Sequence, residues 1–323
     1  MSSKRPCDLD IHPISQRTYR IATPAIVGCY ALLQECLRYR IPGALIYGRP
    51  RLGKTYAIDY LRLLLKRDAP EIASFHIQSQ HKIGHSEGGF FAHMLRATGY
   101  PEPDQGRNSV KRARLTARLR EAALAHRSNR LVMLCDEAQR YSYNEYEWLR
   151  DIHDELALLG IRLHTLLVGQ PQLLHQKNAF QLRGDEQIVA RFMIEEFKFY
   201  GIRSAEETAT CLNGYDQTEY PEKSGWTFTR FFYPDAYEAG LRLTDSAHLV
   251  WNAFAELHHQ AALPGPLEIP MEYFSRAVES ALLETAHLDA ADFKFNPDLW
   301  RFAVKRCGYL KAQRAAENNV KEG

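Results

Sequence analysis

The sequence has no long apolar run, and this argues against a membrane span. Nowhere in its 323 residues does a stretch of about 18 consecutive apolar residues occur. Residues 1–13 are polar and mixed in charge, unlike the basic start and apolar middle of a signal peptide. We therefore expect neither secretion nor membrane anchoring.

Cysteine and histidine do not occur in metal-binding patterns. The six cysteines are scattered and include no C-x-x-C pair, which argues against a zinc site and against a disulfide framework. His76, His81 and His85 also match no zinc spacing, so we interpret them as loop histidines near a phosphate site. Cysteine usage of this kind fits a reducing cytoplasm.

Acidic and basic residues are nearly equal in number, but they are unevenly distributed along the chain. The net charge is only +2, yet residues 111–130 hold seven Lys or Arg against one Glu. Residues 136–155 hold seven acids against two Arg. This contrast is consistent with a polyanionic partner and equally with helix faces that are simply solvated.

The central part of the chain alternates between apolar strand-like segments and helical patterns. Residues 55–67 have the apolar spacing of an amphipathic helix. Alternation of this kind predicts an α/β core with a mainly parallel five-stranded sheet flanked by helices. The expected strands are residues 43–48, 71–78, 130–137, 162–170 and 192–202.

From about residue 204 the patterns become helical throughout, which predicts a small all-helical C-terminal lid domain. The resulting division of the chain is an N-terminal extension (1–20), an α/β core (21–202), a helical lid (203–288) and a basic C-terminal tail (289–323).

Residues 48–55 form a phosphate-loop motif. Gly48 is followed after four residues by Gly53, Lys54 and Thr55, with a predicted strand before and a predicted helix after. The glycines allow backbone N–H groups to converge on phosphate oxygens at the positive end of the helix. Lys54 is expected to reach the β- and γ-phosphates of ATP, and the Thr55 hydroxyl to coordinate Mg²⁺.

Acidic and amide side chains follow two later apolar strands. Asp136 is predicted to hold Mg²⁺ through its water shell, and Glu137 to orient and deprotonate the attacking water. Gln170 is expected to contact the γ-phosphate or the water, or else is a simple loop residue before Pro171.

Hydrolysis also requires a cation at the developing charge. Arg191 is the candidate for a finger offered to a neighbouring subunit, and Arg183 is the second choice. The alternative is that Arg191 only caps the end of a helix.

The order of these segments resembles the AAA+ ATPases, and especially the TniB/TnsC family of transposition regulators, with ExeA-like and Mu B-like ATPases as relatives. DEAQ followed by VGQP is the narrower part of the resemblance. The segments that carry it are IATPAI (21–26), YGRPRLGKT (47–55), LCDEAQRY (134–141), LLVGQPQLL (166–174) and ARF (190–192).

This resemblance implies a bacterial, cytoplasmic, slow ATPase that uses ATP and Mg²⁺ and assembles as rings or helical filaments on double-stranded DNA. It further implies that the assembly recruits a transposase, together with a TniQ-like target-selection protein, and that hydrolysis governs disassembly. The alternatives are an ExeA-like remodelling or secretion-associated ATPase and a P-loop phosphotransferase.

Basic residues are the expected DNA contacts, because phosphates supply sequence-independent affinity. The candidates are Lys82, Lys111, Arg112 and Arg114, and the spacing lets Lys111, Arg114 and Arg118 share one helix face. The opposite interpretation is that arginines such as Arg118 and Arg120 only form ion pairs with Glu121 or the acidic helix at 145–155.

Overall fold

The computed structural model describes residues 5–80 and 84–314, which belong to two compact units. One consists of Ile26–Pro50 and Lys54–Phe199, and we call it the sheet unit. The other consists of Met1–Ala25, Arg51–Gly53 and Tyr200–Gly323, and we call it the helical unit. Each has its own hydrophobic core, so each is described by itself.

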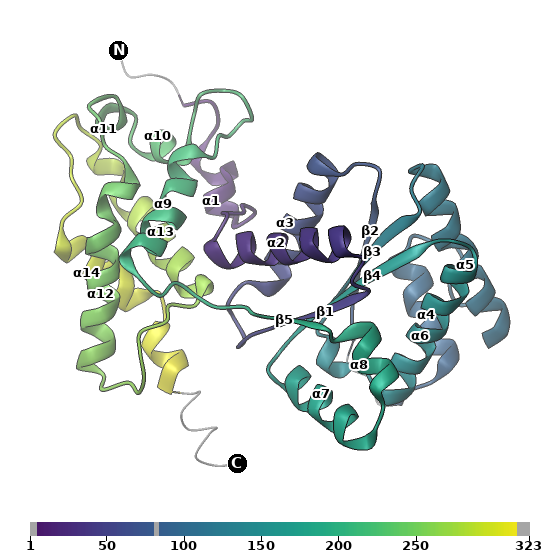
Figure 1. The fold of residues 1–323 in the computed structure, drawn as a ribbon. Helices are drawn as coiled ribbons and strands as arrows, with labels where there is room; N and C mark the ends of the chain where they lie inside the picture. The colour runs from purple at the N-terminus through teal and green to yellow at the C-terminus, as the bar shows by residue number, and fades with distance from the viewer. Residues whose placement is uncertain (1–4, 81–83, 315–323) are drawn as a thin grey trace. The chain divides into compact units, whose positions relative to one another are not determined.

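Among the described residues, five strands form a parallel sheet in the order β2-β3-β4-β1-β5 (Figure 1). Strands β3 and β4 are buried along nearly their whole length, as expected where helices cover both faces of a sheet. The prediction of a mainly parallel five-stranded sheet is therefore confirmed. The strands are β1 (Gly43–Tyr47), β2 (Ala73–Gln78), β3 (Arg130–Asp136), β4 (Arg162–Gly169) and β5 (Glu195–Lys198).

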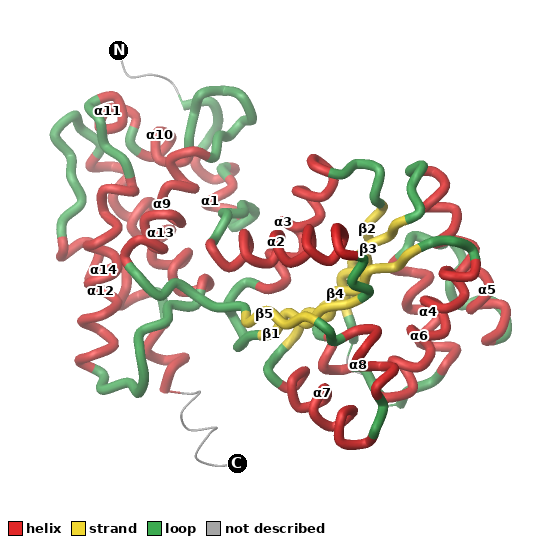
Figure 2. Tube along the Cα trace, in the orientation of Figure 1, coloured by secondary structure: helices red, strands yellow, loops and turns green. Residues whose placement is uncertain are grey.

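Helices cover both faces of this sheet (Figure 2). Because strand side chains alternate, Leu131, Met133 and Cys135 of β3 pack into the core shared with the larger helix layer. One face carries α2 (Pro24–Tyr39) and α3 (Lys54–Asp68). The other carries α4 (Glu87–Ala97), α5 (Asn108–Ala125), α6 (Tyr143–Leu158), α7 (Gln172–Arg183) and α8 (Glu186–Phe192).

The predicted fifth strand at 192–202 is too long. Phe192 ends α8, and β5 covers only Glu195–Lys198. Ile188 and Phe192 are both buried and lie four residues apart, which is the period of a helix. Ile202 pairs with Ile269 in the helical unit, outside the sheet.

The helical unit has an aromatic core, consistent with the predicted all-helical C-terminal domain. Phe228, Phe231, Phe232 and Tyr233 are all buried within it. The elements are η1 (Leu9–Ile11), α1 (Pro13–Gln16), α9 (Ala205–Gln217), α10 (Phe228–Phe232), α11 (Pro234–Glu238), η3 (Leu243–Ser246), α12 (Ala247–Gln260), α13 (Met271–Thr285), η4 (Ala286–Leu288) and α14 (Pro297–Arg306).

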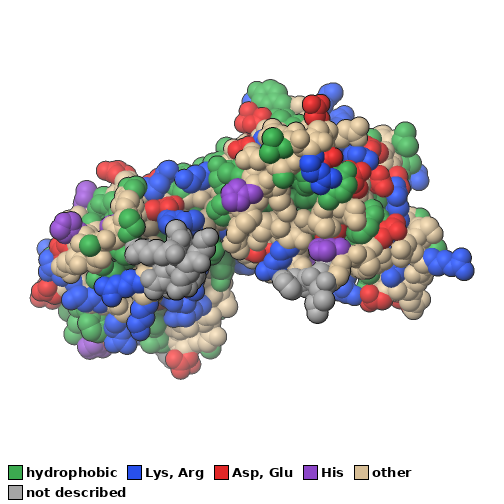
Figure 3. Space-filling model, turned by 90° about the horizontal axis from the view of Figure 1, so that it is seen from below, with side chains coloured by type: hydrophobic (Ala, Val, Ile, Leu, Met, Phe, Trp, Pro, Cys, Tyr) green, Lys and Arg blue, Asp and Glu red, His purple; other side chains and the backbone are tan. Residues whose placement is uncertain are grey.

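This unit draws on more of the chain than the predicted lid at 203–288. The His12 ring stacks on Phe231, with 4.0 Å between ring centroids, and is fully buried. Trp300 of α14 is also fully buried in the same core. Segments close to both ends of the chain therefore complete the helical unit. The face seen in Figure 3 carries several Lys and Arg side chains on this unit.

Burial of His153 makes the sheet unit sensitive to acid. Burial, together with the positive charges of Arg191 and His164, lowers the pKa of His153 to about 3. Its Nε2 lies 2.8 Å from Thr165 Oγ1. The neutral ring is thus part of the core between α6 and β4.

Stability should consequently fall as the pH drops below about 6.5, the ordinary pKa of histidine. The unfolded chain takes up a proton there, whereas folded His153 stays neutral until about pH 3. Between pH 7.5 and pH 5.0 this single group should cost about 2 kcal/mol of unfolding free energy. Urea melts should show that excess loss for wild type relative to His153→Gln, and equal losses in the two proteins would contradict the assignment.

Candidate nucleotide site

The phosphate loop joins β1 to α3, with the predicted strand before it and the predicted helix after it. Gly53 has a φ of +100°, a left-handed conformation that favours glycine. Lys54 begins α3, and its Nζ donates to the carbonyl oxygens of Gly48 (2.7 Å) and Arg49 (2.8 Å). The ammonium group is therefore held against the loop backbone, where a phosphate would meet it.

Lys54 is largely buried near two carboxylates. Burial lowers the pKa of Lys54, while the negative charges of Glu137 and Asp136 oppose that effect. A lysine in this position is ready to exchange carbonyl contacts for phosphate oxygens, because charge-assisted hydrogen bonds are the stronger ones.

Asp136 is the last residue of β3 and is completely buried. Its Oδ2 accepts a hydrogen bond from Thr55 Oγ1 (2.7 Å), and its Oδ1 accepts one from the Glu137 amide (2.9 Å). Burial raises the pKa of Asp136, but the neighbouring His76 ring and these two donors outweigh it, so the pKa lies below its ordinary value. The site thus keeps a buried carboxylate ionised beside the start of α3.

These residues fit a magnesium ion shared with a nucleotide. Mg²⁺ prefers oxygen ligands and is usually bound by one or two carboxylates plus substrate phosphates. Thr55 and Asp136 supply adjacent oxygens, which is the donor set that such a site needs. Within the described residues, no group of three or more His, Cys, Asp or Glu forms a metal site without a nucleotide.

His76 corrects the interpretation of the histidines. It lies in β2, not in a loop, and its Nε2 is 3.9 Å from Asp136 Oδ2. That Nε2 is buried and has no hydrogen-bond partner among the described residues. His85 does lie in the loop after β2, where its Nδ1 is 2.9 Å from Glu145 Oε2. His81 lies outside the described residues.

Gln139, for which the sequence analysis predicted no role, connects Glu137 and Gln170 through hydrogen bonds. Gln139, in η2 (Ala138–Arg140), donates from Nε2 to Glu137 Oε2 (2.8 Å). Its Oε1 accepts the backbone N–H of Gln170 (3.1 Å), the residue that follows β4. The signal in the sequence was a polar side chain two positions after Glu137, in the segment LCDEAQRY.

Both candidate finger arginines have partners within the chain. Arg191 lies in the last turn of α8, and its Nη2 is 2.6 Å from Asp154 Oδ1. Arg183 lies in the last turn of α7, stacks over the Tyr143 ring and is 3.2 Å from Asp185 Oδ2.

The candidate DNA-binding residues on α5 divide between two sides of the helix. Arg112 is paired with Asp151 (2.9 Å) and Glu155 (2.6 Å) of α6. Arg114 donates to the Gln105 carbonyl oxygen (2.8 Å), and this neutral partner leaves its positive charge unmatched. Lys82 lies outside the described residues.

Lys111 and Arg118 also differ in whether a carboxylate pairs with them. Lys111 makes no ion pair within residues 5–80 and 84–314. Arg118 pairs with Glu121 at 3.0 Å, as the ion-pair interpretation expected. Lys111 and Arg114 are thus the predicted DNA contacts whose charge is not already matched by a carboxylate.

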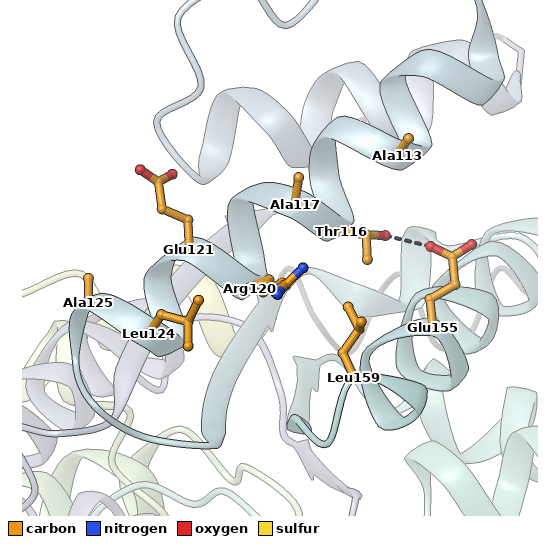
Figure 4. Close-up of a pocket in the computed structure, with 9 residues that line it drawn as sticks. All are labelled: Ala113, Thr116, Ala117, Arg120, Glu121, Leu124, Ala125, Glu155 and Leu159. Atoms are coloured by element: carbon orange, nitrogen blue, oxygen red, sulfur yellow. Dashed lines mark hydrogen bonds between the residues drawn. The ribbon is translucent and has the colours of Figure 1, made fainter.

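A surface cavity of about 730 Å³ occupies the α6 side of α5 (Figure 4). Leu124 and Leu159 line it, and Thr116 donates to Glu155 (2.6 Å) at its edge. None of the predicted nucleotide-site residues lines it. This side of α5 is therefore apolar and ion-paired.

Comparison with known proteins identifies the class of the sheet unit. Residues 42–176 match the family model described as an AAA domain. Together with the parallel sheet and the phosphate loop, this match shows that the chain contains an AAA-type ATPase domain. No curated protein sequence matches the chain.

Solved structures share the fold at low identity. The ORC2 protein of Aeropyrum pernix with ADPNP and ADP is 14% identical, with a TM-score of 0.53 over 91% of this chain and 71% of that one. Its ADP form is 17% identical, with a TM-score of 0.55 over 86% and 67%. The ORC1 protein of the same organism in complex with DNA is 13% identical, with a TM-score of 0.52 over 88% and 65%. These likenesses establish a shared AAA+ fold.

No helix in the described part of the chain is long and apolar enough to cross a membrane.

Replacing Lys54 should strongly weaken nucleotide binding. Lys54→Ala deletes the ammonium group that contacts the loop backbone, so the phosphates would meet no cation at that point. We expect at least about a 10-fold weaker affinity for a fluorescent ATP analogue, since a charged hydrogen bond contributes about 1.5–3 kcal/mol. Lys66→Ala, on the exposed side of α3, is the control. Equal affinities for the two variants would contradict this role.

Proposed function

We propose that this protein is an AAA+ ATPase that binds ATP and Mg²⁺, assembles on duplex DNA and recruits a transposase to its target. The observation that carries the ATPase part is the Thr55–Asp136 hydrogen bond, with Glu137 directly after it in the chain. ATP hydrolysis would be slow and would govern disassembly. The transposition part rests on the resemblance carried by DEAQ (136–139) and VGQP (168–171).

In the proposed reaction, different residues bind the phosphates, hold Mg²⁺ and accept the proton of water. Lys54 binds the β- and γ-phosphates, and Mg²⁺, when held by Thr55 and through water by Asp136, neutralises phosphate charge. A water oxygen forms a bond to the γ-phosphorus while Glu137 accepts its proton. The bond from the γ-phosphorus to the bridging oxygen breaks, and its electron pair leaves with ADP. Gln170 would hydrogen-bond the γ-phosphate or the water.

Assembly would complete the site with an arginine from a neighbouring subunit. Arg191 pairs with a single exposed carboxylate, Asp154, at 2.6 Å. A γ-phosphate carries more negative charge than Asp154, so Arg191 can exchange one partner for the other when subunits meet. Arg183 remains the second choice. Either geometry, a ring or a helical filament, would present a finger to each site.

The proposed DNA surface is the side of α5 that carries Lys111 and Arg114. Lys111 has no carboxylate partner among the described residues, and Arg114 contacts only a carbonyl oxygen and the Tyr100 ring. The solved ORC1 complex with DNA, which has the same fold, supports DNA as the partner. Lys82, from the segment 79–89 of the sequence, is proposed as a further basic contact to DNA.

The proposed role of the assembly is to recruit other proteins to DNA. A nucleotide-dependent coat on DNA offers a repeated surface to a transposase and to a TniQ-like target selector. Electron microscopy of the protein on duplex DNA with ATP, a non-hydrolysable analogue and ADP tests this directly. Coating with the two triphosphates but not with ADP is expected, and identical images in all three states would contradict the proposal.

Glu137→Gln should trap the ATP state. The amide keeps the shape of the side chain but cannot accept the proton of water, so hydrolysis should fall by at least about 100-fold. Complexes with DNA should last longer, as followed by dissociation in the presence of competitor DNA. Glu102→Gln, an exposed residue of the same unit, should behave as wild type. Faster release of DNA by Glu137→Gln would argue against its role in activating water.

Removing the two basic groups that have no carboxylate partner among the described residues should weaken binding to all duplex sequences alike. Lys111→Ala with Arg114→Ala should reduce the slope of log affinity against log salt by about 2. The charge-matched control is Arg62→Ala with Lys66→Ala on the exposed side of α3, which should keep the wild-type slope. Equal slopes for the two double variants would return Lys111 and Arg114 to ordinary solvated side chains.

A further inference from the structure

Glu137 has an unusual backbone conformation and a short-range partner. Its φ of 52° and ψ of 36° lie in the left-handed region, which costs a non-glycine residue on the order of 1 kcal/mol. Strain of this kind persists only where the surroundings fix it. One fixing contact is the Gln139 Nε2 donor at 2.8 Å from Glu137 Oε2, and Arg140 Nη2 lies 3.5 Å from the same oxygen.

The Gln139 side chain uses both ends of its amide. While Nε2 donates to Glu137, Oε1 accepts the N–H of Gln170 at 3.1 Å. A Cβ on Gly169 would collide with this Oε1, so glycine is needed there for the amide to reach β4. The amide therefore spans from the acid after β3 to the polar residue after β4.

The backbone of Gln139 is itself held by α7. Gln176 Nε2 donates to the carbonyl oxygens of Gln139 (3.0 Å) and Tyr141 (3.1 Å). Tyr146, which is fully buried, donates from its hydroxyl to Gln176 Oε1 (3.1 Å). This chain of hydrogen bonds makes Gln139 a fixed point from which its side chain can orient another group.

We propose that Gln139 is a positioning residue for ATP hydrolysis, which holds the Glu137 carboxylate and the Gln170 backbone at a fixed separation through one side-chain amide. This inference rests on the proposed function, because it assigns Gln139 a role in the reaction of Glu137. The Gln139 amide donates to Oε2 and the Arg140 guanidinium forms an ion pair with the same oxygen, which leaves Oε1 for the attacking water in the proposed reaction. An amide suits this role because its nitrogen donates to Glu137 while its separate oxygen accepts from Gln170.

The test measures ATP hydrolysis by Gln139→Met, which keeps the length of the side chain and removes both hydrogen bonds. A displacement of about 1 Å at a general base costs up to roughly 100-fold, so kcat should fall about 10- to 100-fold. The KM and the affinity for a fluorescent ATP analogue should change less than about threefold, because Lys54 and the loop are untouched. Gln181→Ala, exposed on α7, is the control and should match wild type.

Two further variants separate positioning from folding. Gly169→Ala leaves Gln139 unchanged but adds a Cβ that would collide with Gln139 Oε1 and with Leu173 Cδ1 (2.9 Å), so it should lower kcat in the same way while a urea melt checks that the variant is folded. In the Glu137→Gln background, Gln139→Met should lower the residual single-turnover rate by less than about twofold, since residues that act as a unit are not additive. A merely structural residue would lower the rate in both backgrounds.

The outcomes distinguish this inference from the proposed function. If Gln139→Met hydrolyses ATP at the wild-type rate while Glu137→Gln is impaired, the ATPase proposal stands and the role of Gln139 is wrong. A raised KM with unchanged kcat would also overturn it. If Glu137→Gln hydrolyses ATP normally, the proposed reaction is overturned and the positioning role with it.

Discussion

The buried carboxylate of Asp136 is the constraint on which the nucleotide site of the sheet unit depends. An ionised carboxylate without exposure is costly unless donors surround it. The chain supplies Thr55 from the first turn of α3 and the amide of Glu137 from the residue that follows. Satisfying one charge therefore ties the phosphate loop to the end of β3, and it places Glu137 in its left-handed turn.

The strand order explains why three segments far apart in the sequence can act together. β4 lies between β1 and β3, so the hydrogen bond from Thr55 to Asp136 passes the end of β4. Gln170 follows that middle strand, and its backbone N–H donates to Gln139 of the segment after β3. Parallel strands place all these ends at one edge of the sheet, as in other α/β proteins that bind ligands there.

The sequence predicted the features that depend on local patterns. The phosphate loop follows from its spacing, and β3 follows from its apolar run before Asp136 and Glu137. The extent of β5 was not predictable by the same reasoning, because the apolar residues Ile188 and Phe192 suit a helix as well as a strand. A short apolar run is compatible with both a helix and a strand, and packing in the folded protein decides between them.

The sequence also could not show which side chains contact one another in the folded protein. Lys111, Arg112 and Arg114 look equivalent as a basic cluster, yet only Arg112 faces two acids of α6. Side chains one position apart on a helix point about 100° apart, so neighbouring helices decide which charges stay unmatched. Only the packing of α5 against α6 separates them.

The residues at both ends of the segment between β2 and α4 contact the segment that carries Glu137. Arg140 donates to the Ser79 carbonyl oxygen (3.1 Å) where the loop begins, and Glu145 contacts His85 (2.9 Å) where it ends. Both anchors belong to residues 137–145, the segment that also carries Glu137 and Gln139. Ser79 and His85, which flank the segment proposed to contact DNA, therefore contact the same nine residues that carry the proposed general base.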